Sequence, residues 1–265
     1  MVSHWFIRLL LAVFALPAAA LAEAPPSPEQ RGLAIAQEMD RRDSGWGDYT
    51  AAMRMVLRNR QGEESIRELR TRFLEVADDG DKSLIIFDQP RDVQGTALLS
   101  HTHALRPDDQ WLYLPALKRV KRIASNNKSG PFMGSEFAYE DLTSQEVEKY
   151  RYRFLREEDY DGRPTYVLER YPEYEHSGYT RQVVWIDQQI HQPLQTVYHD
   201  RKDARLKTLT LHGYQQYADQ YWRPAEMYME NHQTGKTTRL IWSDYRFGTG
   251  LTARDFDRNS LKRAR

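Results

Sequence analysis

The segment DQWLYLPALKRVKRIASNNKSGPFMGSEFAYEDL, residues 109–142, decides how the rest of this sequence is interpreted. It lies between segments that alternate apolar and polar residues as β-strands do. It combines aromatic residues, a basic run and an apolar tip bordered by glycine and proline. Long connections with so many special residues are more often functional than decorative. We therefore expect residues 115–142 to cap the face of a sheet.

Alternation with a period of two predicts that most of the chain is β-strand. In the first such segment Met53 and Met55 face one way while Arg54 faces the other. Similar segments lie at 48–58, 65–76, 82–87, 96–105, 110–114, 150–159, 164–171, 181–187, 193–200, 206–217, 221–231 and 237–247. They predict a mainly β fold, with a large antiparallel sheet of about eleven strands that is curved.

Two helices are expected beside the sheet. Ser27, Pro28 and Gln30 form a capping-box pattern that begins a helix over residues 28–43. A short helix is expected at 250–262. This is little cover for the apolar face of so many strands, so we expect the sheet to curve around an interior that the helices and residues 115–142 cap. The interior could be a filled core or a ligand cavity, and the sequence leaves both open.

The N-terminus predicts export. Arg8, an apolar run and the Ala20-Leu21-Ala22 cleavage pattern indicate a cleavable signal peptide over residues 1–22, followed by a single domain over 23–265. The sequence has no cysteine, which excludes disulfides, thiolate metal sites and a lipidated N-terminal cysteine. We therefore expect a soluble periplasmic protein that is not itself a lipoprotein and contacts membranes only transiently.

Enzyme motifs find little support. Gly235-Lys236-Thr237 resembles the end of a phosphate loop, but it lies between two strands, where a hairpin turn is the better interpretation. His101 and His103 could share a metal, yet no third ligand has diagnostic spacing. Adjacent Glu140 and Asp141 are better explained as anchors of the long segment than as a catalytic pair. We expect no enzymatic activity, no catalytic residue, no metal and no cofactor.

The charges are balanced, with 38 basic and 38 acidic residues, so an electrostatic partner must be met by a local patch. Cations concentrate at Lys118, Arg119, Lys121 and Arg122. This run is either a solvated loop or a surface for anionic headgroups or an acidic partner. Because the protein is predicted to be exported and its charges balance, nucleic acid is an unsuitable partner.

The segment at 109–142 resembles the signature of the periplasmic outer-membrane lipoprotein-sorting proteins, the LolA-like superfamily, in its larger branch linked to RND-type exporters. The resemblance rests on the Trp111–Pro115 run, Arg122, the Phe132–Ser135 run and the Tyr139–Leu142 run. It implies an incomplete β-barrel closed by helices over a hydrophobic cavity. It also implies a carrier of lipid or of lipoprotein acyl chains toward the outer membrane, with an RND-type inner-membrane transporter as partner.

On this hypothesis methionine and aromatic side chains line the cavity, although core packing would explain them equally well. The lining would comprise Met53, Met55, Leu69, Phe73, Trp111, Tyr113, Tyr152, Trp185, Met227 and Met229. Phe132 and Met133 would form a lid over the cavity, and the run from Lys118 to Arg122 would meet a headgroup or the partner. A periplasmic sensor or scaffold on the same fold is the main alternative, and a hydrolase is less favoured.

Overall fold

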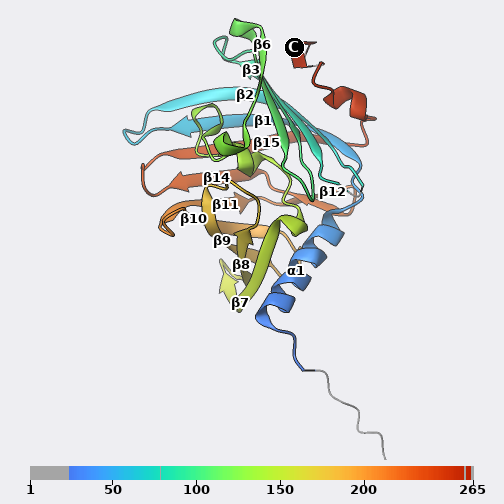
Figure 1. Cartoon of the computed structure of the whole chain (residues 1–265), viewed down its shortest axis with the longest axis vertical. Helices are drawn as coiled ribbons and strands as arrows, with labels where there is room; N and C mark the ends of the chain where they lie inside the picture. The colour runs from blue at the N-terminus through green and yellow to red at the C-terminus, as the bar shows by residue number, and fades with distance from the viewer. Residues whose placement is uncertain (1–23, 78, 260, 264–265) are drawn as a thin grey trace, which may run out of the picture.

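The structure is a computed structural model that describes residues 24–77, 79–259 and 261–263 of the 265-residue chain. The predicted signal peptide lies outside the described residues. One 13-stranded antiparallel sheet dominates the described part (Figure 1). Its strands are β1 (Asp48–Arg58), β2 (Glu64–Leu74), β3 (Lys82–Gln89), β4 (Ala97–His101), β5 (Asp109–Leu114), β6 (Arg119–Arg122), β7 (Tyr150–Tyr160), β8 (Arg163–Pro172), β9 (Tyr179–Asp187), β10 (Pro193–Asp200), β11 (Arg205–His212), β14 (Glu226–Asn231) and β15 (Thr237–Phe247).

The order of strands explains the shape of the sheet. It runs β6-β5-β4-β3-β2-β1-β15-β14-β11-β10-β9-β8-β7, and the first and last strands of the chain meet in the middle, where Arg58 pairs with Thr237. The edge strands β6 and β7 are not paired with each other within this sheet. Figure 1 shows the sheet curving around a concave side without closing. The predicted fold, an incomplete antiparallel barrel, is confirmed.

The helix α1 (Pro28–Asp43) has the predicted bounds. The Ser27 hydroxyl accepts a hydrogen bond from the Gln30 backbone N–H, and the Gln30 side chain accepts one from the Ser27 N–H. Gly32 brings the helix against β7, because a Cβ at this position would lie 2.9 Å from the Phe154 backbone nitrogen. The helix therefore covers the β7 end of the concave side, where Ala36 packs with the residues around Tyr152 (Figure 1).

The C-terminal segment covers the other side of the sheet. It forms two short 3-10 turns, η6 (Ala253–Phe256) and η7 (Leu261–Arg263), where the sequence predicted one helix. Phe256 and Leu261 are fully buried against Leu84 and Leu99, on the convex face. The expectation that this segment caps the concave side is therefore wrong.

Two further differences arise from backbone turns. The predicted strand 206–217 is divided at Gly213, which has positive φ, and the predicted strand 221–231 is divided at Pro224 and Ala225. Ala218 and Asp219, which also have positive φ, form the turn between the two predicted strands. The pieces β12 (Gln215–Tyr217) and β13 (Tyr221–Arg223) therefore form a separate two-stranded sheet, which packs through Tyr217 and Tyr221 against Phe247 of β15.

The connection between β5 and β7 contains β6 and five 3-10 turns. The turns are η1 (Pro115–Leu117), η2 (Ser125–Asn127), η3 (Phe132–Gly134), η4 (Tyr139–Leu142) and η5 (Val147–Lys149). After β6 the chain crosses the concave side, as Figure 1 shows in green. The predicted cap over the sheet is therefore present.

Candidate functional site

The concave side is packed solid where η3 lies on it. Phe132 is fully buried and its ring centroid lies 5.7 Å from that of Phe87. The same cluster contains Met55, Leu69 and Met229. These predicted lining residues therefore belong to a filled core beneath η3, and they border neither of the two cavities described below.

The η3 turn is fixed to the sheet at several points. Arg67 donates a hydrogen bond from Nη1 to the Met133 carbonyl at 2.6 Å. The Glu136 N–H donates to Thr238 Oγ1 at 3.0 Å, and Asn231 Nδ2 donates to Glu136 Oε2 at 2.6 Å. The structure thus places Phe132 and Met133 in a pinned plug and not in a lid over a cavity opening. The physical reason is that the turn has its own hydrogen-bonding partners on β2, β14 and β15.

Glu140 and Asp141 anchor the next turn. Glu140 accepts hydrogen bonds from the Tyr174 hydroxyl, the Ser177 hydroxyl and the Gly178 N–H. Asp141 accepts from Lys207 Nζ at 2.7 Å and from the Tyr179 hydroxyl at 2.8 Å. The two carboxylates thus point to different partners, which is the anchoring arrangement that the sequence favoured over a catalytic pair.

The rest of the concave side is hollow. Two adjoining cavities of about 310 and 1190 Å³ lie beside η4 and α1. Their walls share Tyr49, Asp141, Leu211 and Met227, so the cavities form neighbouring chambers. Ligand sites in proteins are typically hollows of about 300–1,000 Å³ with mostly apolar walls. The hollow part is therefore large enough to hold a lipid-sized ligand.

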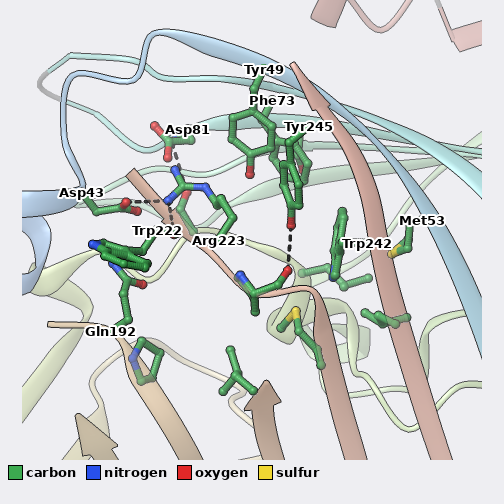
Figure 2. A pocket seen from close by; sticks show the side chains of 18 of the residues that line it. Asp43, Tyr49, Met53, Phe73, Asp81, Gln192, Trp222, Arg223, Trp242 and Tyr245 are labelled. Carbon is green, nitrogen blue, oxygen red and sulfur yellow. Dashed lines mark hydrogen bonds and ion pairs between the residues drawn. The ribbon is translucent and has the colours of Figure 1, made fainter. Parts of the chain in front are cut away.

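Aromatic side chains dominate the smaller chamber (Figure 2). Tyr49 stacks on Phe73 with ring centroids 4.6 Å apart, and Trp242 stacks on Tyr245 at 6.1 Å. Arg223 closes one side, donating to Asp43 Oδ1 at 2.6 Å (Figure 2). Burial raises the pKa of the Tyr49 hydroxyl to about 12, so this hydroxyl stays uncharged at neutral pH.

Four of the ten predicted lining residues border these chambers. Met53, Phe73 and Met227 line the smaller one, and Tyr152 and Met227 line the larger one. Sequence reasoning missed Trp46, Trp222 and Tyr245 in the smaller chamber. Tyr49 could have been predicted as a lining residue from the sequence, because it shares the inward face of its strand with Met53.

Trp111, Tyr113 and Trp185 lie on the convex face, which corrects their predicted position. Trp111 and Tyr113 pack with the cluster that contains Phe256. Trp185 packs with Val167 and its indole N–H donates to Glu158. Both faces of these strands are apolar because the C-terminal segment and the outer side chains cover the convex face. Alternation therefore does not reveal which face is concave.

The basic run lies on an edge strand away from the chambers. Lys118, Arg119, Lys121 and Arg122 are exposed on and beside β6, the outermost strand of its half of the sheet. Arg122 pairs with Asp109. Leu117 at the tip of the same hairpin is 63 % exposed. The four cations thus form an accessible surface that does not line either chamber.

Acidic side chains surround the larger chamber. Its lining includes Asp40, Asp43, Glu75, Asp79, Asp81, Asp141, Glu146 and Glu148. Burial raises the pKa of Glu146, and burial followed by repulsion from Glu148 raises that of Asp40. For Asp81, burial followed by repulsion from Glu146 raises the pKa to about 7. The chamber therefore changes its charge near neutral pH.

We predict that Asp81 makes the stability of the protein depend on pH. Its folded-state pKa of about 7 lies above the ordinary aspartate value of 3.8, so its protonated form is favoured by folding and this contribution is lost as the pH rises through about 7. Asp81→Asn should therefore raise the free energy of unfolding at pH 8 and leave it nearly unchanged at pH 4. Urea denaturation at both pH values measures this, with the exposed turn residue Asp161→Asn as control. Equal stability of wild type and Asp81→Asn at pH 8 would contradict it.

The two histidines considered as metal ligands have separate partners. His101 Nε2 lies 2.8 Å from the Phe256 carbonyl oxygen, and His103 Nδ1 lies 2.8 Å from Asp79 Oδ2. In the described ranges, no group of three or more histidine, aspartate or glutamate side chains is arranged to hold a metal ion. No helix in that part of the chain has the length and apolarity needed to cross a bilayer.

A curved sheet that is packed at one end and hollow at the other defines a half-barrel fold. A domain from Vibrio parahaemolyticus provisionally assigned to outer membrane lipoprotein sorting is similar to this chain, with 59% identity, a TM-score of 0.87 and coverage of 88% of this chain and 99% of that one. A DUF1329 family protein from Desulfovibrio piger is 31% identical, with a TM-score of 0.84 and coverage of 89% and 100%. The chain therefore belongs to the same family as these two proteins, one of which is provisionally assigned to outer membrane lipoprotein sorting.

Other comparisons agree with this assignment at the level of the fold. A LolA superfamily protein from Nitrosomonas europaea is 18% identical, with a TM-score of 0.69 over 86% of this chain and 98% of that one. A family model described as an uncharacterized protein matches residues 79–263. No curated protein matches the chain.

Proposed function

We propose that the protein is a periplasmic carrier that holds a lipid, or the acyl chains of a lipoprotein, in the two chambers and takes it toward the outer membrane. The observation that carries this proposal is the hollow part of the concave side, where the apolar aromatic chamber adjoins the larger one. The family supports it, because a relative with 59% identity is assigned to lipoprotein sorting. The carrier has no enzymatic role in this proposal.

The energy of lipid transfer explains why such a lining is needed. Removing an acyl chain from a bilayer costs about 0.8 kcal/mol per methylene, or roughly 12 kcal/mol for a sixteen-carbon chain. The walls around Met53, Phe73 and Met227 would recover most of this cost. The remaining drive would come from a partner, for which an RND-type inner-membrane transporter is the candidate. The surface of Lys118, Arg119, Lys121 and Arg122 would contact that partner or anionic headgroups.

Native mass spectrometry of the protein purified from the periplasm tests the proposal directly. A bound lipid is expected as an added mass that organic extraction removes. Recovery of only the bare chain, together with no binding of added palmitate, would reject the carrier and favour a sensor or scaffold on the same fold.

We predict that a bulky side chain in the chambers weakens ligand binding with little change in stability. Met227 borders both chambers and is partly exposed, so Met227→Trp would place an indole in the space the ligand uses. Palmitate affinity is expected to fall at least about tenfold, equivalent to about 1.4 kcal/mol. Isothermal titration calorimetry measures this, and Leu117→Trp, on the distant hairpin, serves as control. Unchanged affinity in Met227→Trp would mean that the chambers do not hold the ligand.

A further inference from the structure

A row of polar side chains crosses the concave side within the hollow part. Successive strand pairings place Tyr152 opposite Arg170, Arg170 opposite Gln182, Gln182 opposite Tyr198 and Tyr198 opposite Lys207. Directly opposed residues in antiparallel strands project from the same face of a sheet. Tyr152, Arg170 and Tyr198 all line the larger chamber. The row therefore carries two cations, Arg170 and Lys207.

The two cations differ in whether a carboxylate neutralises their charge. Lys207 is paired with Asp141 at 2.7 Å, and both side chains are almost fully buried. Arg223, which lines the smaller chamber, is paired with Asp43 at 2.6 Å. Arg170 donates from Nε to Gln182 Oε1 at 2.6 Å and lies 5.0 Å from the centroid of the Tyr150 ring. Across the described ranges, no carboxylate lies within 4 Å of the Arg170 guanidinium.

This arrangement leaves a planar cation facing the cavity. A charge removed from bulk water is unfavourable unless it is paired and hydrogen-bonded. The two terminal nitrogens of a guanidinium form a fork that matches a carboxylate or a phosphate. With Nε already occupied by Gln182, the terminal nitrogens of Arg170 remain for such a group.

We propose that Arg170 is a subsite for the anionic headgroup of the bound lipid, either a phosphate or a carboxylate. This inference rests on the proposed carrier function and specifies its ligand. The hydrocarbon chain would lie on the apolar residues beside Arg170 on the same face, which include Leu168, Val184, Ile186 and Leu209. The hydroxyl of Tyr152, directly opposite Arg170, would be able to donate to the same headgroup, as would that of Tyr198, which lies beyond Gln182 in the row.

The charge of the chamber distinguishes a lipid from a free anion. Eight acidic residues line the larger chamber, and Arg170 is the one arginine or lysine among its described lining residues. Their field opposes entry of a small anion such as inorganic phosphate. An amphiphile overcomes this opposition because its hydrocarbon chain gains free energy on leaving water. The anion therefore reaches Arg170 as part of a lipid.

Comparison of charged and uncharged ligands with the same chain tests the subsite. Wild-type protein should bind palmitate, and lysophosphatidic acid with the same sixteen-carbon chain, at least about tenfold more tightly than 1-hexadecanol, a preference of about 1.4 kcal/mol. Arg170→Met should abolish this preference and bind hexadecanol as the wild type does, while Arg170→Lys should keep part of it. Arg151→Met is the matched control, because Arg151 also lies over a tyrosine, at 5.2 Å from Tyr171, but is exposed and paired with Glu173.

The outcomes separate this inference from the carrier itself. Retention of the palmitate preference in Arg170→Met, with normal binding of hexadecanol, would overturn the subsite and leave the carrier intact. Failure of all three lipids to bind the wild type would overturn the carrier. Displacement of palmitate by millimolar inorganic phosphate would show that the site takes free anions, which would overturn its assignment to a lipid. Thermal unfolding of each variant checks that the fold is retained.

Discussion

Asp141→Ala is expected to lower the free energy of unfolding by about 3–5 kcal/mol, because it leaves Lys207 as an unpaired buried cation. The side chains of Asp141 and Lys207 are 5% and 4% exposed, and their charged atoms lie 2.7 Å apart. Asp141 also accepts hydrogen bonds from the Ala138 N–H at 2.7 Å and from the Tyr179 hydroxyl. The substitution therefore releases the η4 turn from β9 and β11 together. Urea denaturation at neutral pH measures the loss.

An exposed ion pair provides the control for this prediction. Glu173 pairs with Arg151 at 2.9 Å, with side chains 47% and 67% exposed, so Glu173→Ala should cost no more than about 1 kcal/mol. The double variant Asp141→Leu/Lys207→Met removes both buried charges and should recover part of the stability lost in Asp141→Ala. If Asp141→Ala cost no more than Glu173→Ala, the pair would not anchor the capping segment.

The sequence predicted the elements better than their arrangement. The start of α1 was predictable because Ser27, Pro28 and Gln30 specify it locally. Most strands were predictable from alternation, which depends only on neighbouring residues. Alternation divides a strand into two faces without saying which face is concave, and Trp111 and Trp185 were assigned to the wrong one for this reason. That choice depends on the distant Phe256 and on the curvature of the whole sheet.

Arg170 stands out in the sequence as a charged residue in an apolar pattern. It follows Tyr166 and Leu168 at a period of two, so it lies on the apolar face of β8. A charged residue on such a face is a candidate for a buried pair or a ligand contact. The absence of a carboxylate partner within the described residues could not be predicted, because it depends on where residues 115–144 cross the sheet. Asp141 pairs with Lys207 on β11 and therefore does not neutralise Arg170 on β8.

Phe132→Ala is expected to lower the free energy of unfolding by about 3–5 kcal/mol, as for other fully buried aromatic residues. The Phe132 ring is fully buried, and it lies 5.7 Å from both Phe87 and Tyr139. Its removal would open a cavity beneath η3 that the hydrogen bond from Arg67 to Met133 prevents from collapsing. The loss is measured by urea denaturation, alongside Leu117→Ala, an exposed position that should change stability by no more than about 0.5 kcal/mol.

The same variant distinguishes a plug from a lid. A plug that belongs to the core stabilises the protein and leaves palmitate exchange unaffected where the fold is retained. A lid contributes little to stability, and its truncation speeds the release of the ligand. Stopped-flow measurement of palmitate release from Phe132→Ala therefore complements the denaturation experiment. Faster release with a stability loss below about 1 kcal/mol would restore the lid interpretation, since a large-to-small substitution in a packed core costs more than this.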